Sequence, residues 1–229
     1  MKTRGIILLI LLIISINQLR GQDIKIDKLD YSSGIYNTKE DFINKNVNPN
    51  IELEIEKINL IIETDSLIRR CFFFEKENHK KIKKAFAISF NGQLYFRVGA
   101  ILKNRGENKE SLSAPSKSAF VLVTKGGNQF LYCEAGLINP WSTGLSVGVS
   151  NGIGGMAGYV IGEQIEKAYP ATTVFGTGLV WDKEKNKFVV FSSCDKFNDF
   201  ISGFNIDKLN CERDFINLFE IREKIEIIK

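Results

Sequence analysis

The fold is decided by residues 84–102, which read KAFAISF, then Asn91-Gly92, then QLYFRVGAIL. Two apolar runs joined by Asn-Gly are typical of a β-hairpin, because a type I′ turn needs positive φ at both central positions. We therefore expect residues 84–90 and 93–102 to pair as antiparallel strands.

Further hairpins are expected on the C-terminal side of this one. Residues 119–125 and 129–134 are joined across Gly126-Gly127, and a third pair, ending at residue 181 and resuming at residue 187, encloses a polar turn. On the N-terminal side, residues 51–56 alternate Ile or Leu with Glu, which predicts a half-buried strand, and residues 67–75 read as another strand.

Helices are expected near both ends of the chain. Thr38 is a good N-cap, and the two acids that follow it favour a short helix over residues 39–46. Apolar residues at helical spacing predict two C-terminal helices, with the faces Phe197, Phe200, Ile201, Phe204 and Phe215, Leu218, Phe219, Ile225. The predicted fold is a single α+β domain over residues 22–229, with a mostly antiparallel sheet built from hairpins and a glycine-rich central segment.

The central segment, residues 135–162, carries no charge and forms a glycine-zipper pattern. A flat helical face would be made by Gly144, Gly148, Gly152, Gly154, Gly155, Gly158 and Gly162. As a helix, residues 144–162 would be about 28 Å long, close to the thickness of a bilayer core. Packing against the rest of the protein is favoured over membrane insertion, because Ser146, Ser150 and Asn151 would be poorly satisfied in lipid.

The N-terminus has the features of a cleavable secretory signal peptide over residues 1–21. Lys2 and Arg4 precede nine consecutive Ile and Leu residues, and Gly21 stands before Gln22. We predict that the mature protein begins at or near Gln22. Removal of residues 1–21 would leave 28 basic and 27 acidic residues, and this balance gives no reason to expect a nucleic-acid partner.

All four cysteines follow the predicted cleavage point. An even number in an exported chain favours disulfides, and four cysteines allow three pairings. We expect Cys194 to pair with Cys211 across the first C-terminal helix, and Cys71 to pair with Cys133. The alternative is four buried thiols, because the flanks, such as Cys71-Phe-Phe-Phe74, are apolar.

Residues with catalytic or ligand-binding chemistry are few. His79 is the only histidine and lies in a lysine-rich loop, which is a solvated loop or an anion-binding patch. Glu52, Glu54 and Glu56 share one strand face, which is typical of a solvated surface more than of a metal site. Residues 152–157 match G-x-G-x-x-A but follow no buried strand, so no cofactor is expected.

Three stretches together carry a resemblance to a known group of proteins. They are residues 34–42 (GIYNTKEDF), residues 81–96 around the Asn-Gly turn, and the hairpin over residues 181–188 with the Phe-rich segment after it. The chain resembles uncharacterised secreted proteins of Bacteroidota-type bacteria, which open with a G-I-Y-x-T/S-x-E-x-F motif after the signal peptide. The resemblance implies export and carries over no catalytic residue.

The sequence therefore favours an exported, non-enzymatic module of the periplasm or cell surface that binds an envelope or extracellular partner or supports the envelope. The alternative is a membrane-associating or self-assembling protein that acts through residues 144–162. A third class, a hydrolase that uses a carboxylate pair, stays open because the chain has 27 acids.

Overall fold

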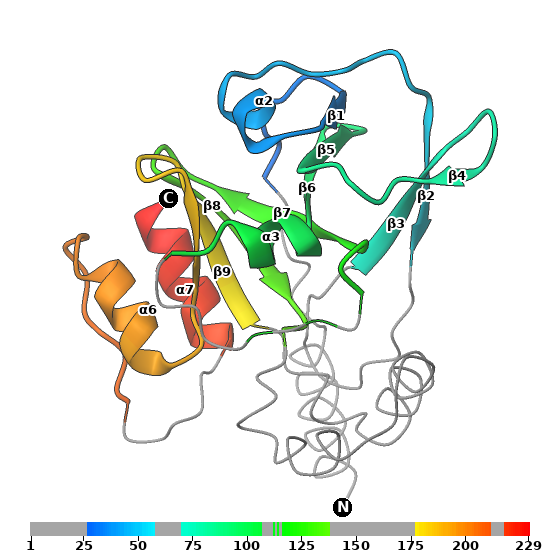
Figure 1. Cartoon of the computed structure of the whole chain (residues 1–229). Coiled ribbons are helices and arrows are strands. Elements are labelled where there is room, and N and C mark those ends of the chain that lie inside the picture. Colours follow the sequence, from blue (N-terminus) through cyan, green and yellow to red (C-terminus); the bar gives the residue numbers. More distant parts are fainter. Residues whose placement is uncertain are drawn as a thin grey trace, which may run out of the picture.

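The computed structural model describes residues 27–57, 70–106, 112, 114, 116–137, 177–211 and 218–229. Within them the chain forms four helices and a ten-stranded sheet (Figure 1). The strands are β1 (Gly34–Tyr36), β2 (Leu53–Lys57), β3 (Arg70–Glu75), β4 (Lys80–Lys81), β5 (Ala87–Phe90), β6 (Gln93–Arg97), β7 (Phe120–Gly126), β8 (Phe130–Ala135), β9 (Thr177–Asp182) and β10 (Lys187–Val190). The helices are α2 (Lys39–Ile43), α3 (Val98–Lys103), α6 (Cys194–Ile201) and α7 (Leu218–Ile228).

The strands pair antiparallel in one curled sheet, as the predicted α+β class requires. Its main path is β1-β5-β6-β7-β8-β9-β10, while β3 pairs with β2, β4 and β7. Phe120 and Val121 of β7 pair with β6 on one side and β3 on the other, whereas the end of β7 pairs with β8. A register shift between Val123 and Lys125 marks a β-bulge, which bends the strand. Because of this bend, strands β5–β6 and β8–β9 share one core.

The Asn-Gly hairpin that sets this arrangement is confirmed. Asn91 and Gly92 have φ angles of 52° and 73°, as a type I′ turn requires, and join β5 to β6. The hairpins β7–β8 and β9–β10 are confirmed as well. At the N-terminal end, Thr38 caps α2 as predicted, because its hydroxyl accepts from the Asp41 amide while the Asp41 carboxylate accepts from the Thr38 amide.

Aromatic side chains fill the core between the two halves of the sheet. Phe42 of α2 lies among them, with ring centroids 5.2 Å from Phe96 and 5.8 Å from Trp181. Phe188 of β10 packs 4.9 Å from Trp181 on the same core. These buried rings tie the N-terminal helix to the last hairpin.

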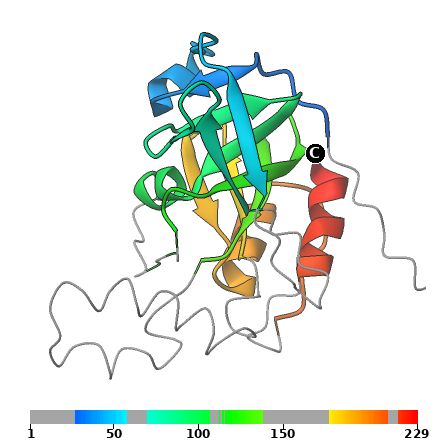
Figure 2. The same ribbon diagram turned by 90° about the vertical axis from the view of Figure 1, so that its right-hand side faces the viewer.

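The helices α6 and α7 cover the outer face of β8 and β9. Their apolar residues pack against Phe130, Tyr132 and Val180 in a cluster of their own. Figure 1 places α6 and α7 at one side of the molecule and β2–β4 at the other, and the side view in Figure 2 has β2 in the foreground. The predicted apolar face over residues 197–204 is confirmed.

Helix α3 corrects one sequence-based expectation, because the second run of the Asn-Gly hairpin does not stay extended to residue 102. β6 ends at Arg97, and Val98, Ala100 and Ile101 are buried on a six-residue helix. The chain turns where the amides of Val98 and Gly99 donate to the carbonyls of Ala119 and Lys117. A short apolar run fits the period of a strand as well as that of a helix, so the sequence pattern alone does not distinguish strand from helix over residues 98–102.

The apolar face of the last helix is also corrected. Phe219 is 45% exposed, and the buried residues of α7 are Ile221 and Ile225. The residues of α7 that face the sheet follow the i, i+3, i+7, i+10 spacing and are Leu218, Ile221, Ile225 and Ile228, whereas Phe219 lies on another side of the helix.

Four sequence-based expectations fall outside the described residues. They concern the signal peptide over residues 1–21, the glycine-zipper face from Gly144 to Gly162, the G-x-G-x-x-A pattern at residues 152–157 and the contribution of Phe215. Among the helices that the structure describes, none has the length and apolar character needed to cross a membrane.

Candidate functional site

A groove of about 730 Å³ lies where the β9–β10 hairpin, α6 and the residues after α3 meet. β10 forms its floor through Lys187 to Val190, and Lys196, Phe200 and Phe204 of the α6 region form one wall. Arg105, Gly106 and Leu112 line it as well, with Arg105 and Gly106 beside β10. This β10–α6 groove combines charged and aromatic side chains, the composition expected of a ligand site.

The β9–β10 turn is fixed by Asp182, whose side chain is 12% exposed. Its Oδ1 accepts from the amides of Glu184 and Lys185 at 3.0 and 2.8 Å, and its Oδ2 lies 3.3 Å from Lys185 Nζ. Asn186 completes the turn at a φ of 49°. Asp182 also lines the groove, and both of its carboxylate oxygens are engaged within the turn.

The half-buried charged groups of the groove are cationic. They are Arg105, Lys187 and Lys196, whereas Glu184 and Asp199 are exposed at the rim. Arg105 Nε donates to the Leu102 carbonyl at 3.1 Å, and Lys196 Nζ donates to Ser192 Oγ at 2.9 Å. These bonds hold two of the three cations in place in the lining of the groove.

Lys187 is the cation best placed for a ligand. It lies beside Gly106, where an added Cβ would stand 3.4 Å from Lys187 Nζ, so the glycine leaves room for the lysine side chain. No ion pair joins Lys187 to a carboxylate within the part of the chain that the structure describes. A half-buried ammonium that makes no ion pair among the described residues favours the binding of an anion.

Aromatic rings supply the apolar part of the groove. Phe130 lies 5.7 Å from Phe200 and 6.1 Å from Phe204, both edge-on, and Phe200 and Phe204 are 5.5 Å apart. Phe200 and Phe204 are half-buried, so part of each ring faces solvent. Such rings can contact an apolar group of a ligand.

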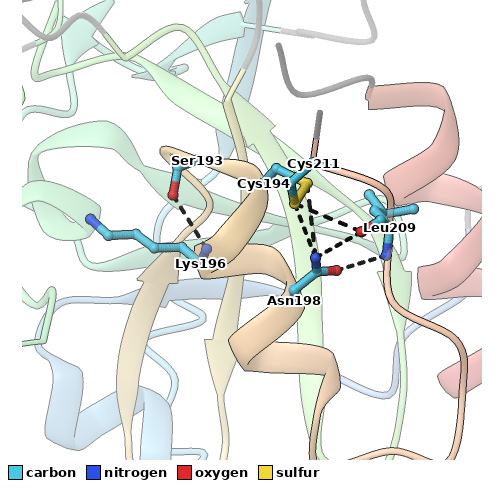
Figure 3. The surroundings of a disulfide bond; sticks show 6 residues. All are labelled: Ser193, Cys194, Lys196, Asn198, Leu209 and Cys211. Carbon is cyan, nitrogen blue, oxygen red and sulfur yellow. Dashed lines mark hydrogen bonds between the residues drawn. A yellow bond between two sulfur atoms is a disulfide. The ribbon is translucent and has the colours of Figure 1, made fainter. Parts of the chain in front are cut away.

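The predicted disulfide between Cys194 and Cys211 is present and anchors the α6 wall (Figure 3). The two Cα atoms are 5.6 Å apart, and the bond joins the first residue of α6 to the segment that follows the helix. Asn198 reinforces the closure, because its Nδ2 donates to the Leu209 carbonyl at 2.9 Å and its Oδ1 accepts from the Leu209 amide at 2.8 Å. Ser193 caps the helix, accepting from the Lys196 amide.

The expected disulfide between Cys71 and Cys133 is wrong, because both are buried thiols that belong to no disulfide. Cys71 pairs with Phe120 and Cys133 with Val123, three positions apart along β7, and the two side chains are buried in different core clusters. Side chains an odd number of positions apart on a strand point to opposite faces of the sheet, so the two thiols do not meet. Burial, and then the charge of Glu134, raises the pKa of the Cys133 thiol.

The histidine and the glutamates singled out in the sequence lie together, on β2 and the β3–β4 turn. His79 Nδ1 is paired with Glu54 and its ring stacks 4.6 Å from Phe74, while Glu52 pairs with Lys76 at 3.1 Å. Among the described residues no cluster of metal-ligating side chains is found. These residues do not line the β10–α6 groove.

The residues of the groove were not identified from the sequence. Arg105 and Lys187 are 82 positions apart in the chain, and the bridge between Arg105 and Phe188 brings their segments together. The Phe-rich face of α6 was identified from the sequence as a packing face. Nothing in that pattern indicated that two of its rings would line a groove. A comparison of the chain with known protein families, curated proteins and solved structures finds no match.

Proposed function

We propose that this chain is an exported binding module that holds an organic anion with an apolar tail in the β10–α6 groove. The observation that carries the proposal is the half-buried Lys187 ammonium, which has no carboxylate partner among the described residues and faces a groove walled by Phe200 and Phe204. A ligand carboxylate could pair with the Lys187 ammonium while the apolar tail of the ligand packs along the rings of Phe200 and Phe204.

Export is supported by two independent features. Residues 1–21 have the pattern of a secretory signal, and the Cys194–Cys211 disulfide is of a kind that persists in oxidising compartments. The test is N-terminal sequencing of the protein recovered from the periplasm or cell surface. We expect Gln22 at or near the N-terminus, and retention of Met1 would overturn export.

The binding proposal is tested by calorimetric titration with octanoate and, as a neutral match, 1-octanol. We expect octanoate to bind and octanol to bind at least tenfold more weakly. A charge-assisted contact contributes about 1.5–3 kcal/mol, so Lys187→Gln should weaken octanoate binding by about 10- to 100-fold.

The matched control is Lys80→Gln, which removes the same charge from an exposed position on β4. It should bind octanoate as the unaltered protein does. Equal affinity of the Lys187 and Lys80 variants, or equal affinity for octanoate and octanol, would overturn the proposal.

A further inference from the structure

A second cavity, of about 930 Å³, lies on the other side of the β9–β10 turn. Residues 27–31, the end of α2 and the β7–β8 and β9–β10 turns surround it. Lys183 and Asn186 face this cavity, whereas Glu184 and Lys185 of the same turn line the β10–α6 groove. The two cavities are therefore separate, and a ligand site in this turn cavity is independent of the function proposed for the groove.

An aromatic ring forms one wall of this turn cavity. Tyr31 is stacked on Phe42 with centroids 5.1 Å apart and planes 6° apart, and Phe42 meets Trp181 edge-on. Tyr31 is thus the half-buried end of an aromatic stack that reaches into the core. Burial, followed by the nearby Tyr36 and the Asp30 carboxylate, raises the pKa of Tyr31 to about 12, so the ring stays a neutral phenol.

Two ammonium groups face the same cavity. Lys45 Nζ lies 5.7 Å from the Tyr31 ring centroid, and Lys183 Nζ donates to the Gly127 carbonyl at 2.7 Å. Burial, and then the positive charge of Lys45, lowers the pKa of Lys183. The two cations therefore repel each other, and within the described ranges neither is joined to a carboxylate by an ion pair.

The other charged groups of the cavity do not neutralise this pair. Asp27 accepts from the Gly126 amide at 3.1 Å and lies 3.4 Å from Lys229 Nζ, so its charge is engaged. Asp30 and Lys28 are exposed at the rim. An anion bound between Lys45 and Lys183 would replace a repulsion by two attractions.

We propose that the turn cavity binds an acidic sugar, with its anionic group between Lys45 and Lys183 and its ring on Tyr31. The C–H bonds on the face of a pyranose carry partial positive charge, which suits the negative face of an aromatic ring. The amides of Asn128 and Asn186, one from each turn, can donate to and accept from the sugar hydroxyls.

The test is an NMR chemical-shift titration of the intact protein with glucuronate, glucose and acetate. Glucuronate carries both features of the predicted ligand, glucose lacks the charge and acetate lacks the ring. We expect glucuronate to bind at least tenfold more tightly than either of the others, with shifts at Tyr31 and Asn186. Equal affinities for glucuronate and acetate would overturn the role of the ring, and equal affinities for glucuronate and glucose would overturn the anion site.

Two variants assign the binding to this cavity. Lys45→Gln changes an exposed side chain and should weaken glucuronate binding at least fivefold. Lys187→Gln in the β10–α6 groove should leave it unchanged, and saturation with octanoate should also leave it unchanged. Glucuronate binding that is lost in Lys187→Gln and kept in Lys45→Gln would overturn the second site while leaving the groove proposal standing.

Discussion

Arg222 of α7 holds Glu134 of β8 in a two-pronged ion pair, with Nε 2.7 Å from Oε1 and Nη2 2.9 Å from Oε2. The Glu134 side chain is fully buried, and the Tyr132 hydroxyl also donates to its Oε1, at 2.7 Å. The pair connects a helix to a strand 88 positions earlier in the chain. It fixes where α7 lies on the sheet and leaves the apolar contacts of Ile221 and Ile225 to supply the rest of the packing.

Arg222→Met should destabilise the protein by about 3–5 kcal/mol, because it leaves the Glu134 carboxylate buried without its counter-charge. The measurement is the free energy of unfolding in urea. As a control, the double variant Glu134→Leu/Arg222→Met should be more stable than Arg222→Met alone, since no unpaired charge remains. A loss below about 1 kcal/mol for the single variant would contradict the prediction.

Loss of the disulfide should cost stability and groove binding together. The Cys194–Cys211 bond closes a loop of 17 residues, which contributes about 3 kcal/mol in the chain-entropy account. The double variant Cys194→Ser/Cys211→Ser should therefore unfold at lower urea and bind octanoate more weakly, since α6 carries one wall of the groove. Dithiothreitol should lower the stability of the unaltered protein and leave that of the double variant unchanged, because Cys71 and Cys133 are already thiols.

Local sequence patterns predicted the hairpins and the end helices because the responsible residues are neighbours in the chain. Asn91-Gly92 and Thr38 act within four residues of themselves. The state of residues 98–103 depends instead on hydrogen bonds to residues 117 and 119, which no local pattern contains. The phase of α7 depends in the same way on a partner in β8.

The candidate sites were beyond prediction for a related reason. The lysines of the groove and of the turn cavity are far apart in the chain. They become neighbours only in the folded, curled sheet. The pairing of Cys194 with Cys211 was predictable because a single helix separates them. The expected pairing of Cys71 with Cys133 was wrong because the sheet buries the two side chains in different core clusters.

Replacement by alanine should lower the free energy of unfolding more at Gly34 than at Gly92. Gly34 has a φ of 137°, and a Cβ there would stand 2.4 Å from the Asn48 carbonyl oxygen, whereas a Cβ at Gly92, with a φ of 73°, would meet only the end of Lys28. Gly92→Ala should cost about 1–2 kcal/mol from the left-handed backbone alone. Gly34→Ala should cost more, because β1 would also have to move from its bridge with Asn48. Urea unfolding of both variants measures this order, and a reversed order would contradict it.

The contacts of Glu226 should make stability depend on pH in the acid range. Hydrogen bonds from Lys125 and then Lys229 lower the pKa of Glu226 below its ordinary value of 4.5. A group whose pKa is lower in the folded state contributes stability that is present above 4.5 and is lost as the pH falls through the folded value. The variant Glu226→Gln should therefore be less stable than the unaltered protein at neutral pH, and the difference should shrink as the pH falls below 4.5.

Urea unfolding at a series of pH values measures this stability difference. The matched control is Glu40→Gln, at an exposed position on α2, for which we expect a smaller difference. A stability difference for Glu226→Gln that stays constant from neutral pH to well below 4.5 would show that the ion pairs with Lys125 and Lys229 do not hold the end of α7 on β7.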